Sequence, residues 1–228
     1  MVRVLSESNR EKLVSIKAGS VTMSANLAIP AYARGVVLFA HGSGSSRHSP
    51  RNRYVAEILR QAKLATLLLD LLTVEEETLD RYTRQRRFDI GLLAKRLIYA
   101  TDWLHHNPLT RDLRIGYFGA STGSAAALVA AAERSRDIGA IVSRGGRVDL
   151  AAASIPLVRS PALLIVGGED IPVLRINQTA LAQFCVEVQL QVVPGATHLF
   201  EEPGALAEVA QLASQWFVRH LIPVHQQT

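Results

Sequence analysis

The residues best suited to chemistry begin with Ser121, at the centre of the motif Gly119–Gly123 (GASTG). The motif follows the apolar run Leu113–Phe118 and opens a stretch of small residues that reads as a helix. A sharp strand-to-helix turn at this point lifts the serine hydroxyl above the sheet edge, and a side chain at either glycine would collide with the backbone. The start of the helix supplies free N–H groups suited to developing negative charge. We interpret Ser121 as a candidate nucleophile, the alternative being an ordinary helix N-cap.

A serine nucleophile needs a base, and the base needs an acid that orients it. Two later apolar runs end in an acid and a histidine, Asp170 and His198. Parallel strands bring their carboxyl ends to one sheet edge, so we expect both side chains near Ser121. Asp149 ranks second as the acid and Glu169 is a further rival. Each candidate also has a structural alternative, since Asp170 could cap a helix and His198 could be a satisfied loop histidine.

A glycine-rich loop, His41–Ser46 (HGSGSS), directly follows the apolar run that ends at Ala40. We expect the N–H groups of Ser43 and Thr122 to form an oxyanion hole, because such a loop lets the backbone approach a substrate oxygen. His41 is a weaker candidate for substrate contact, and its favoured role is to fix the loop. The loop lacks the lysine and the glycine spacing of the common phosphate-binding motifs.

On these motifs the chain resembles the α/β-hydrolases of the compact dienelactone hydrolase-like type, from about Leu27 to its last helix. The order Ser121, Asp170, His198 is the order expected of that fold. The motifs that carry the resemblance are His41-Gly42, Gly119–Gly123, Gly167–Asp170 (GGED) and Gly195–Phe200 (GATHLF).

The stretch His41–Arg53 further resembles a subgroup of small hydrolases that occur beside, or fused to, phosphoribosyltransferase domains, and we expect no such domain in these 228 residues. One departure matters: dienelactone hydrolases proper use a cysteine nucleophile, whereas this motif carries Ser121. The single cysteine, Cys185, lies in a segment that reads as a helix end or strand start, so it cannot replace the serine. The difference favours ordinary ester hydrolysis over dienelactone cleavage.

The expected activity is therefore a serine hydrolase that cleaves small carboxylic esters through an acyl-enzyme. The same residues could serve thioester, lactone or amide hydrolysis, and a non-catalytic hydrolase-like binding domain is the alternative from another class. We expect no cofactor and no metal, because the seven histidines show no ligand spacing such as H-E-x-x-H. The expected partner is a small-molecule ester, and a homodimer stays open.

The elements that must position these residues alternate between strand and helix. Six runs are apolar almost without a break, which is typical of strands buried on both faces: Gly35–Ala40, Leu64–Leu69, Leu113–Phe118, Ile138–Val142, Ala162–Val166 and Val188–Val193. Helix-length segments separate them, at about 51–62, 88–106, 122–134, 172–184 and 204–221. We predict one α/β-hydrolase domain over residues 1–228, with an eight-stranded, mostly parallel sheet, helices on both faces and a minimal cap or none.

Two segments fall outside that alternation. Leu13–Ala18 and Val21–Ile29 are closely spaced and predict an antiparallel hairpin at one sheet edge. The charged insertion 73–89 (TVEEETLDRYTRQRRFD) is interpreted first as a solvated connection and second as a flap beside a site. A cap larger than this insertion does not fit the length, so we expect a preference for short acyl groups.

Composition excludes several classes of protein. The chain is 48% hydrophobic and 20% charged, as globular domains are, and no apolar run is long enough to span a membrane. The formal charge of +5 comes from scattered residues without a binding motif, so nucleic acid is not an expected partner. Arg47, Arg51 and Arg53 could orient an anionic substrate group, but solvated arginines at a helix start are favoured. The absence of a signal sequence and the single cysteine predict a cytoplasmic protein with no membrane partner.

Overall fold

The sheet in the computed structural model, which describes residues 11–222, contains eight strands in the order β1-β2-β4-β3-β5-β6-β7-β8. The first two strands are antiparallel to their neighbours, and all pairs from β4 onward in that order are parallel. The strands are β1 Lys12–Ala18, β2 Val21–Ala28, β3 Gly35–Ala40, β4 Leu64–Leu69, β5 Ile115–Ala120, β6 Ile138–Arg144, β7 Ala162–Gly167 and β8 Val188–Val193. The predicted edge hairpin and parallel sheet are therefore confirmed.

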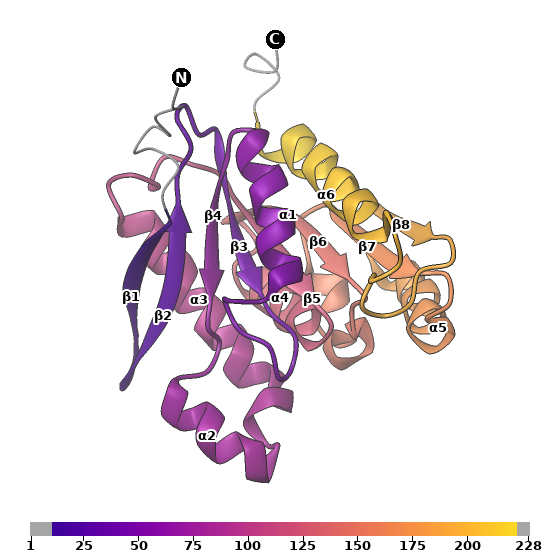
Figure 1. The fold of residues 1–228 in the computed structure, drawn as a ribbon, viewed down its shortest axis with the longest axis horizontal. Helices are drawn as coiled ribbons and strands as arrows, with labels where there is room; N and C mark the ends of the chain where they lie inside the picture. Colours follow the sequence, from indigo (N-terminus) through magenta and orange to yellow (C-terminus); the bar gives the residue numbers. More distant parts are fainter. Residues whose placement is uncertain (1–10, 223–228) are drawn as a thin grey trace.

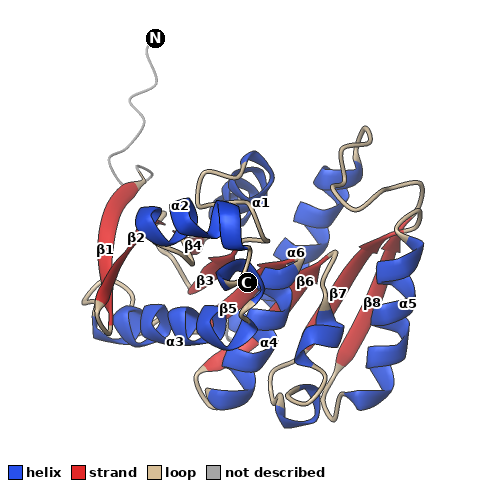
Figure 2. Ribbon diagram, turned by 90° about the horizontal axis from the view of Figure 1, so that it is seen from below, coloured by secondary structure: helices blue, strands red, loops and turns tan. Residues whose placement is uncertain are grey.

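Helices cover both faces of this sheet, as Figures 1 and 2 show. Helices α1 and α6 pack on one face, and α3, α4 and α5 pack on the other. Their bounds are α1 Pro50–Gln61, α3 Ile90–His106, α4 Thr122–Glu133, α5 Ile171–Ala180 and α6 Ala205–Leu221. None of the helices described is both long and apolar enough to cross a bilayer.

Coverage from both sides explains the unbroken apolar runs. Every residue of β3, β4, β5 and β7 is buried. Edge strand β1 instead begins with exposed residues and alternates toward its end, because one face of the hairpin meets solvent. A run without alternation therefore marks a central strand, and the periodicity of the hairpin marks its place at the edge.

The strand that carries Ser121 differs in its bounds from the prediction. It was expected over Leu113–Phe118, but β5 runs from Ile115 to Ala120. Gly119 and Ala120 still pair with the neighbouring strand β6, opposite Ser143 and Arg144. The strand thus continues up to the serine itself, and the turn follows without a connecting loop.

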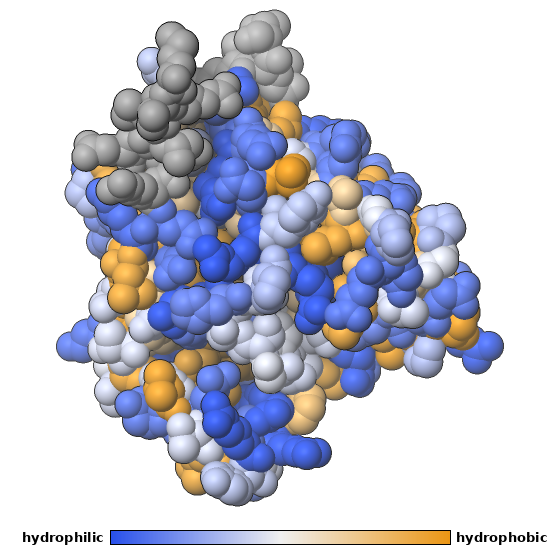
Figure 3. Space-filling view, in the orientation of Figure 1, coloured by the Kyte–Doolittle hydropathy of each residue, from blue (hydrophilic) through white to orange (hydrophobic). Residues whose placement is uncertain are grey.

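The charged insertion forms a helix of its own, α2 (Val74–Thr83), followed by a 3₁₀ turn at Arg86–Phe88. Thr73 begins α2 with a capping box, in which its side chain and that of Glu76 each accept a backbone N–H. The helix lies beyond the carboxyl ends of β3 and β4 (Figure 1). In Figure 3 hydrophilic and apolar residues are intermixed over this end of the molecule.

Candidate active site

Ser121 occupies a sharp turn between β5 and α4. Its backbone φ of 51° and ψ of −119° are unusual for a residue with a side chain, and its hydroxyl makes no capping bond to α4. A methyl group added at Gly119 would lie 2.5 Å from Ser124 Cα, and one at Gly123 would lie 2.2 Å from the Ala40 carbonyl oxygen. The predicted need for two glycines is therefore confirmed. The strained turn leaves the hydroxyl available for chemistry.

The segment 144–147 holds the Ser121 backbone from both sides. The Ser121 N–H donates to the Arg144 carbonyl at 3.1 Å, and the Arg147 N–H donates to the Ser121 carbonyl at 3.1 Å. Asn177, fully buried on α5, donates to the Gly146 carbonyl at 2.9 Å and ties this segment to the helix. Asn177 could not be identified from the sequence, because a buried amide in a helix carries no distinguishing local pattern.

His198 follows β8 and is bonded to Asp170, which follows β7. The His198 Nδ1 lies 2.6 Å from an Asp170 carboxylate oxygen, with the histidine side chain 39% exposed and the aspartate 11% exposed. Asp170 stands at the N-cap position of α5 but makes no side-chain cap bond. Its carboxylate is therefore free to hold the imidazole through Nδ1, and the ring Nε2 makes no hydrogen bond to another described residue.

The two rival acids have other environments. Asp149 forms a two-point ion pair with Arg147, at 2.9 and 2.7 Å. This pair lowers the pKa of Asp149, chiefly through the Arg147 hydrogen bonds and against a smaller opposing effect of burial. Glu169 is exposed and makes no side-chain bond to another described residue. Asp170 is thus the carboxylate that the fold brings to the histidine.

Gly145 provides the space for the histidine ring. It has a φ of +53°, and a methyl group there would lie 3.3 Å from both Cε1 and Nδ1 of His198. The ring therefore lies against the end of β6, next to the strand end that carries Ser121. A side chain at position 145 would add backbone strain and push the ring outward.

The glycine-rich loop contacts the serine, as expected, but the backbone N–H of Ser43 already donates a hydrogen bond within the protein. A methyl group at Gly42 would lie 3.1 Å from Ser121 Cβ, so the loop packs directly on the nucleophile candidate. The Ser43 N–H donates to the Thr122 hydroxyl at 2.9 Å. Thr122 is the first residue of α4, so its own N–H has no acceptor within the helix. The two positions predicted for an oxyanion hole thus lie together.

His41 makes two bonds that fix the loop. Its Nδ1 lies 2.9 Å from the Gly42 carbonyl, and its Nε2 accepts the Leu71 N–H at 3.1 Å. Burial lowers the pKa of His41, more than the Gly42 carbonyl and the nearby carboxylates of Asp70 and Glu77 raise it. A neutral ring that donates through Nδ1 and accepts through Nε2 satisfies both bonds.

A pocket of about 520 Å³ opens between the glycine-rich loop and α2. One wall is His41–Ser46 with Thr122, and the opposite wall includes Glu77, Asp80, Arg81 and Arg87. Four residues from the charged insertion thus line the pocket. The second interpretation of that insertion, a flap beside a site, is the one that fits this geometry.

Helix α2 is held in place by carboxylates. Its two buried residues are Glu76 and Asp80. Asp80 accepts the Arg87 Nε at 2.5 Å and the Arg86 N–H at 2.6 Å, while Glu76 binds Arg86 and Arg96 at 2.7 Å each. Burial alone would raise the pKa of Asp80, but the hydrogen bonds from Arg87 and the backbone outweigh it and lower the pKa. Asp80 therefore stays ionised and keeps Arg87 at the pocket wall.

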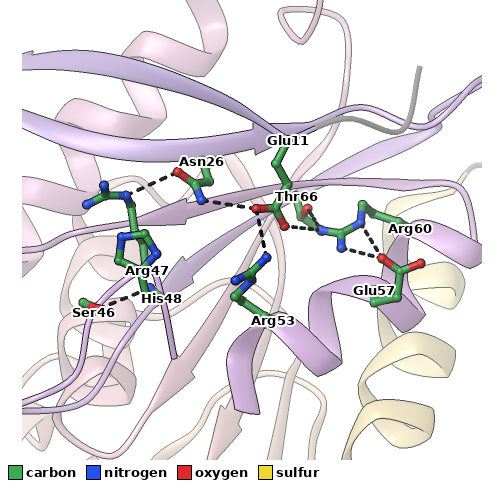
Figure 4. Close-up of polar contacts among 9 residues, drawn as sticks. All are labelled: Glu11, Asn26, Ser46, Arg47, His48, Arg53, Glu57, Arg60 and Thr66. Atoms are coloured by element: carbon green, nitrogen blue, oxygen red, sulfur yellow. Dashed lines mark hydrogen bonds and ion pairs between the residues drawn. The ribbon is translucent and has the colours of Figure 1, made fainter. Parts of the chain in front are cut away.

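Arg47 does not face this pocket. Its guanidinium pairs with the Asp70 carboxylate, and its Nε donates to Asn26 Oδ1 at 3.3 Å. Figure 4 shows the side chain turned toward Asn26 of β2. The expectation that Arg47 contacts substrate therefore has no support in this geometry, because its guanidinium already forms an ion pair with the Asp70 carboxylate. Arg51 and Arg53 likewise pair with Glu201 and Glu11.

No group of three or more histidine, cysteine, aspartate or glutamate side chains within residues 11–222 is placed to hold a metal ion. Cys185 is exposed and lies between α5 and β8, away from the turn that carries Ser121. The candidate site is thus built from a serine, a histidine, an aspartate and backbone N–H groups.

Comparison with known proteins places these features in a family. The sequence model of the dienelactone hydrolase family matches residues 26–221. A dienelactone hydrolase from Anabaena variabilis ATCC 29413, of known structure, is 62% identical, with a TM-score of 0.92 over 94% of this chain and 99% of that chain. Est1E from Butyrivibrio proteoclasticus is 15% identical with a TM-score of 0.77, over 91% of this chain and 98% of its own, a likeness of fold alone.

A curated relative from Mycobacterium tuberculosis strain H37Rv is 58% identical over 212 residues and is provisionally named a phosphoribosyl transferase. The match covers 93% of this chain but 47% of the relative. This chain therefore spans about half the length of that relative.

Proposed function

This chain belongs to the dienelactone hydrolase family, and we propose that within it the protein is a serine hydrolase that cleaves small carboxylic esters through an acyl-enzyme. The observation that carries the proposal is the 2.6 Å bond between His198 Nδ1 and Asp170, formed at the same sheet edge as the strained turn of Ser121. An imidazole held in this way has one use in an acyl transfer, which is to move the serine proton.

In the proposed mechanism, the Ser121 hydroxyl attacks the ester carbonyl while His198 Nε2 accepts its proton. Asp170 holds the protonated ring through Nδ1–H and stabilises its charge. The protonated ring then gives its proton to the departing alcohol. Water next attacks the acyl-enzyme with His198 again as base, which releases the acid and restores the serine.

We propose that the N–H groups of Ser43 and Thr122 bind the oxyanion of the tetrahedral intermediate. The Thr122 hydroxyl accepts the Ser43 N–H in this structure, so the carbonyl oxygen of the substrate must replace it. This exchange costs little, because one hydrogen-bond acceptor takes the place of another. Each donor is expected to contribute on the order of 3 kcal/mol to stabilisation of the transition state.

We propose that the acyl group of the substrate enters this pocket, whose lining includes Gly42 and Thr122 beside Ser121 but not Ser121 itself, and that short acyl groups are preferred. Its walls combine serine hydroxyls and two histidines with the charged side chains of α2, and its apolar lining is mainly Leu71, Leu72 and Leu93. A long alkyl chain in this pocket would strip water from the charged groups of its wall. We expect acetate and butyrate esters of p-nitrophenol to be cleaved with higher kcat/KM than octanoate or longer esters.

Of the functions named for the relatives, we propose only the hydrolase function for this chain. The transferase name belongs to a protein more than half of which has no counterpart here. The family match and the site geometry lie in the same stretch, residues 26–221, which supports a hydrolase as the function of this part.

The direct test is Ser121→Ala assayed with p-nitrophenyl acetate. Loss of the nucleophile should lower kcat by at least about 10⁴-fold, because the remaining groups cannot form an acyl-enzyme. Ser124→Ala is the matched control, since Ser124 is buried in α4, directly after the turn that carries Ser121, and its hydroxyl has no partner among the described residues. Turnover in Ser121→Ala near that of the wild type, or failure of a fluorophosphonate probe to label Ser121, would exclude the mechanism.

A further inference from the structure

Three arginines among the described residues are buried to a similar extent, and one of them lacks a counter-charge. Arg60, Arg96 and Arg144 are 8%, 6% and 8% exposed. Arg60 pairs with Glu11 and Glu57, and Arg96 pairs with Glu76 at 2.7 Å. Arg144 makes no ion pair and no side-chain hydrogen bond within residues 11–222, and its Nη1 is fully buried without a partner. A buried, uncompensated guanidinium is costly, so its presence needs a reason.

Arg144 lies at the carboxyl end of β6, on the face of the sheet that α1 covers. Ala140 and Val142 of the same strand belong to the core cluster formed with α1 and α6, and side chains two residues apart share a face. The carbonyl of Arg144 accepts the Ser121 N–H. The guanidinium therefore lies beside the candidate active site but on the α1 side of the sheet.

The start of α1 adds further unpartnered polar atoms to this region. The Arg51 side chain binds Glu201 at 3.1 Å through Nη1, but its Nε is buried without a partner. Asn52 is 2% exposed and its Oδ1 has no donor. Asn52 lies one turn before Val55 and Ala56, which pack on the sheet, so it occupies the same face of α1 nearer the reaction edge.

The charges in this region are positive. Burial, and to a smaller extent the charge of Arg51, lower the pKa of Arg144 to about 10. Among residues 11–222, the carboxylate that bonds to Arg51, Asn52 or Arg144 is that of Glu201, which is 64% exposed and pairs with Arg51. Such an exposed pair is weak and exchanges readily with solvent or with another anion.

We infer that Arg144, Arg51 and Asn52 form a binding site for a phosphate group, beside the candidate catalytic residues and separate from the ester pocket. The planar guanidinium of Arg144 and the Arg51 Nε donate to phosphate oxygens. A singly protonated phosphate also carries an O–H, which donates to Asn52 Oδ1. The Arg51–Glu201 pair opens to admit the ligand. This site goes beyond the proposed ester hydrolysis and does not depend on it.

The experiment measures thermal unfolding of the intact protein against inorganic phosphate, with sodium chloride added to keep the ionic strength constant at pH 7. Wild-type protein should show a saturable rise in Tm, by about 3–5 °C once phosphate exceeds its dissociation constant tenfold. Arg144→Met should abolish the rise. Arg159→Met is the control for loss of one positive charge, because Arg159 is exposed, and it should keep the rise.

The same variants separate a binding role from a structural one. Without phosphate, Arg144→Met should unfold at the wild-type temperature or above, because it removes a buried charge that has no partner. A marked fall in Tm, or failure to fold, would mean that Arg144 has an internal partner and would overturn the inference. So would a wild-type protein with no phosphate-specific rise, or an Arg144→Met variant that keeps it.

A second titration with phenyl phosphate distinguishes the two sources of the group. A rise in Tm with both ligands assigns the site to the phosphoryl group of an organic ester, and a rise with inorganic phosphate alone assigns it to the free ion. Ester turnover is not measured in either titration, so the outcome is independent of the proposed hydrolase activity.

Discussion

The two halves of the candidate active site are held together by different forces. The catalytic half comprises the strand ends that carry Ser121, Asp170 and His198. It is fixed by backbone bonds and by close packing at glycines. The substrate half comprises the loop 41–49 and α2, and α2 docks through the buried carboxylates Glu76 and Asp80.

Because the two halves are held differently, mutations in them should affect different kinetic constants. Rigid backbone positions hold catalytic groups within a fraction of an ångström, as proton transfer requires. A helix that buries ion pairs and leaves Val74, Leu79 and Tyr82 exposed has no apolar docking face of its own. We therefore expect changes in the catalytic half to lower kcat, and changes in the substrate half to raise KM. Three kinetic predictions test this division, and a fourth concerns the stability of the loop that carries His41.

The largest effect is expected from Asp170→Asn. The amide keeps the shape of the side chain but cannot hold His198 in the tautomer that leaves Nε2 free, so kcat should fall by about 10³–10⁴-fold. KM should change by less than about threefold. Steady-state kinetics with p-nitrophenyl acetate measures both. Asp149→Asn is the control, because Asp149 pairs with Arg147 instead. A tenfold loss or less in Asp170→Asn would contradict the assignment.

Gly145→Ala should lower kcat by roughly 10²-fold, since the added methyl group meets the His198 ring at 3.3 Å and displaces the base. Gly204→Ala is a matched control: Gly204 also has a positive φ, +85°, but a methyl group there meets nothing within 4 Å. The control should lose stability without losing kcat. Equal kcat losses in the two variants would show that backbone strain, not the contact with His198, is responsible.

Asp80→Asn should raise KM about three- to tenfold with kcat within about twofold, because the change weakens the hold on Arg87 and loosens the pocket wall. Glu75→Gln on the exposed side of α2 serves as the control. Kinetics at low ionic strength gives the clearest comparison, since salt screens charges. If Asp80→Asn lowers kcat and leaves KM unchanged, the expected separation of kcat and KM effects between the two halves is wrong.

The smallest effect concerns His41 and pH. Burial keeps the pKa of this imidazole below its ordinary value of 6.5, so the unfolded chain binds a proton that the folded protein does not. The contribution of His41 to stability is therefore fully present above about pH 6.5 and declines as the pH falls below it. Urea unfolding between pH 7 and 5 should show this decline, and His41→Gln should flatten it. If the stability of His41→Gln declines equally steeply with falling pH, the decline comes from other titratable groups.

Much of the fold followed from patterns along the chain. Four of the six strands predicted from apolar runs lie within one residue of their predicted bounds, namely β3, β4, β7 and the edge strand β8. For β3, β4 and β7 the reason is that helices on both faces keep the apolar run continuous. The bounds of β5 were less predictable. Gly119 and Ala120 read as part of the turn motif, yet their pairing with β6 extends the strand to the serine.

The site could be predicted in part, for a physical reason. Ser121, Asp170 and His198 each follow a strand, and a parallel sheet brings such ends together whatever the side chains are. The ion-pair partner of a given arginine could not be predicted in this way, because it depends on which carboxylates approach from other elements. Asp70 reaches Arg47, whereas no carboxylate of the described chain reaches Arg144.

The sequence by itself determined the class of fold, the order of the candidate triad and the two glycines of its turn, because these depend on local geometry and on strand order. Only the tertiary structure decided that the charged insertion lines a pocket, that Asp170 rather than Asp149 meets the histidine, and that one buried arginine stands without a partner. Each of these facts depends on the distance between side chains far apart in the chain. Such distances are set by how the helices and strands pack, and they cannot be read from the spacing of residues along the sequence.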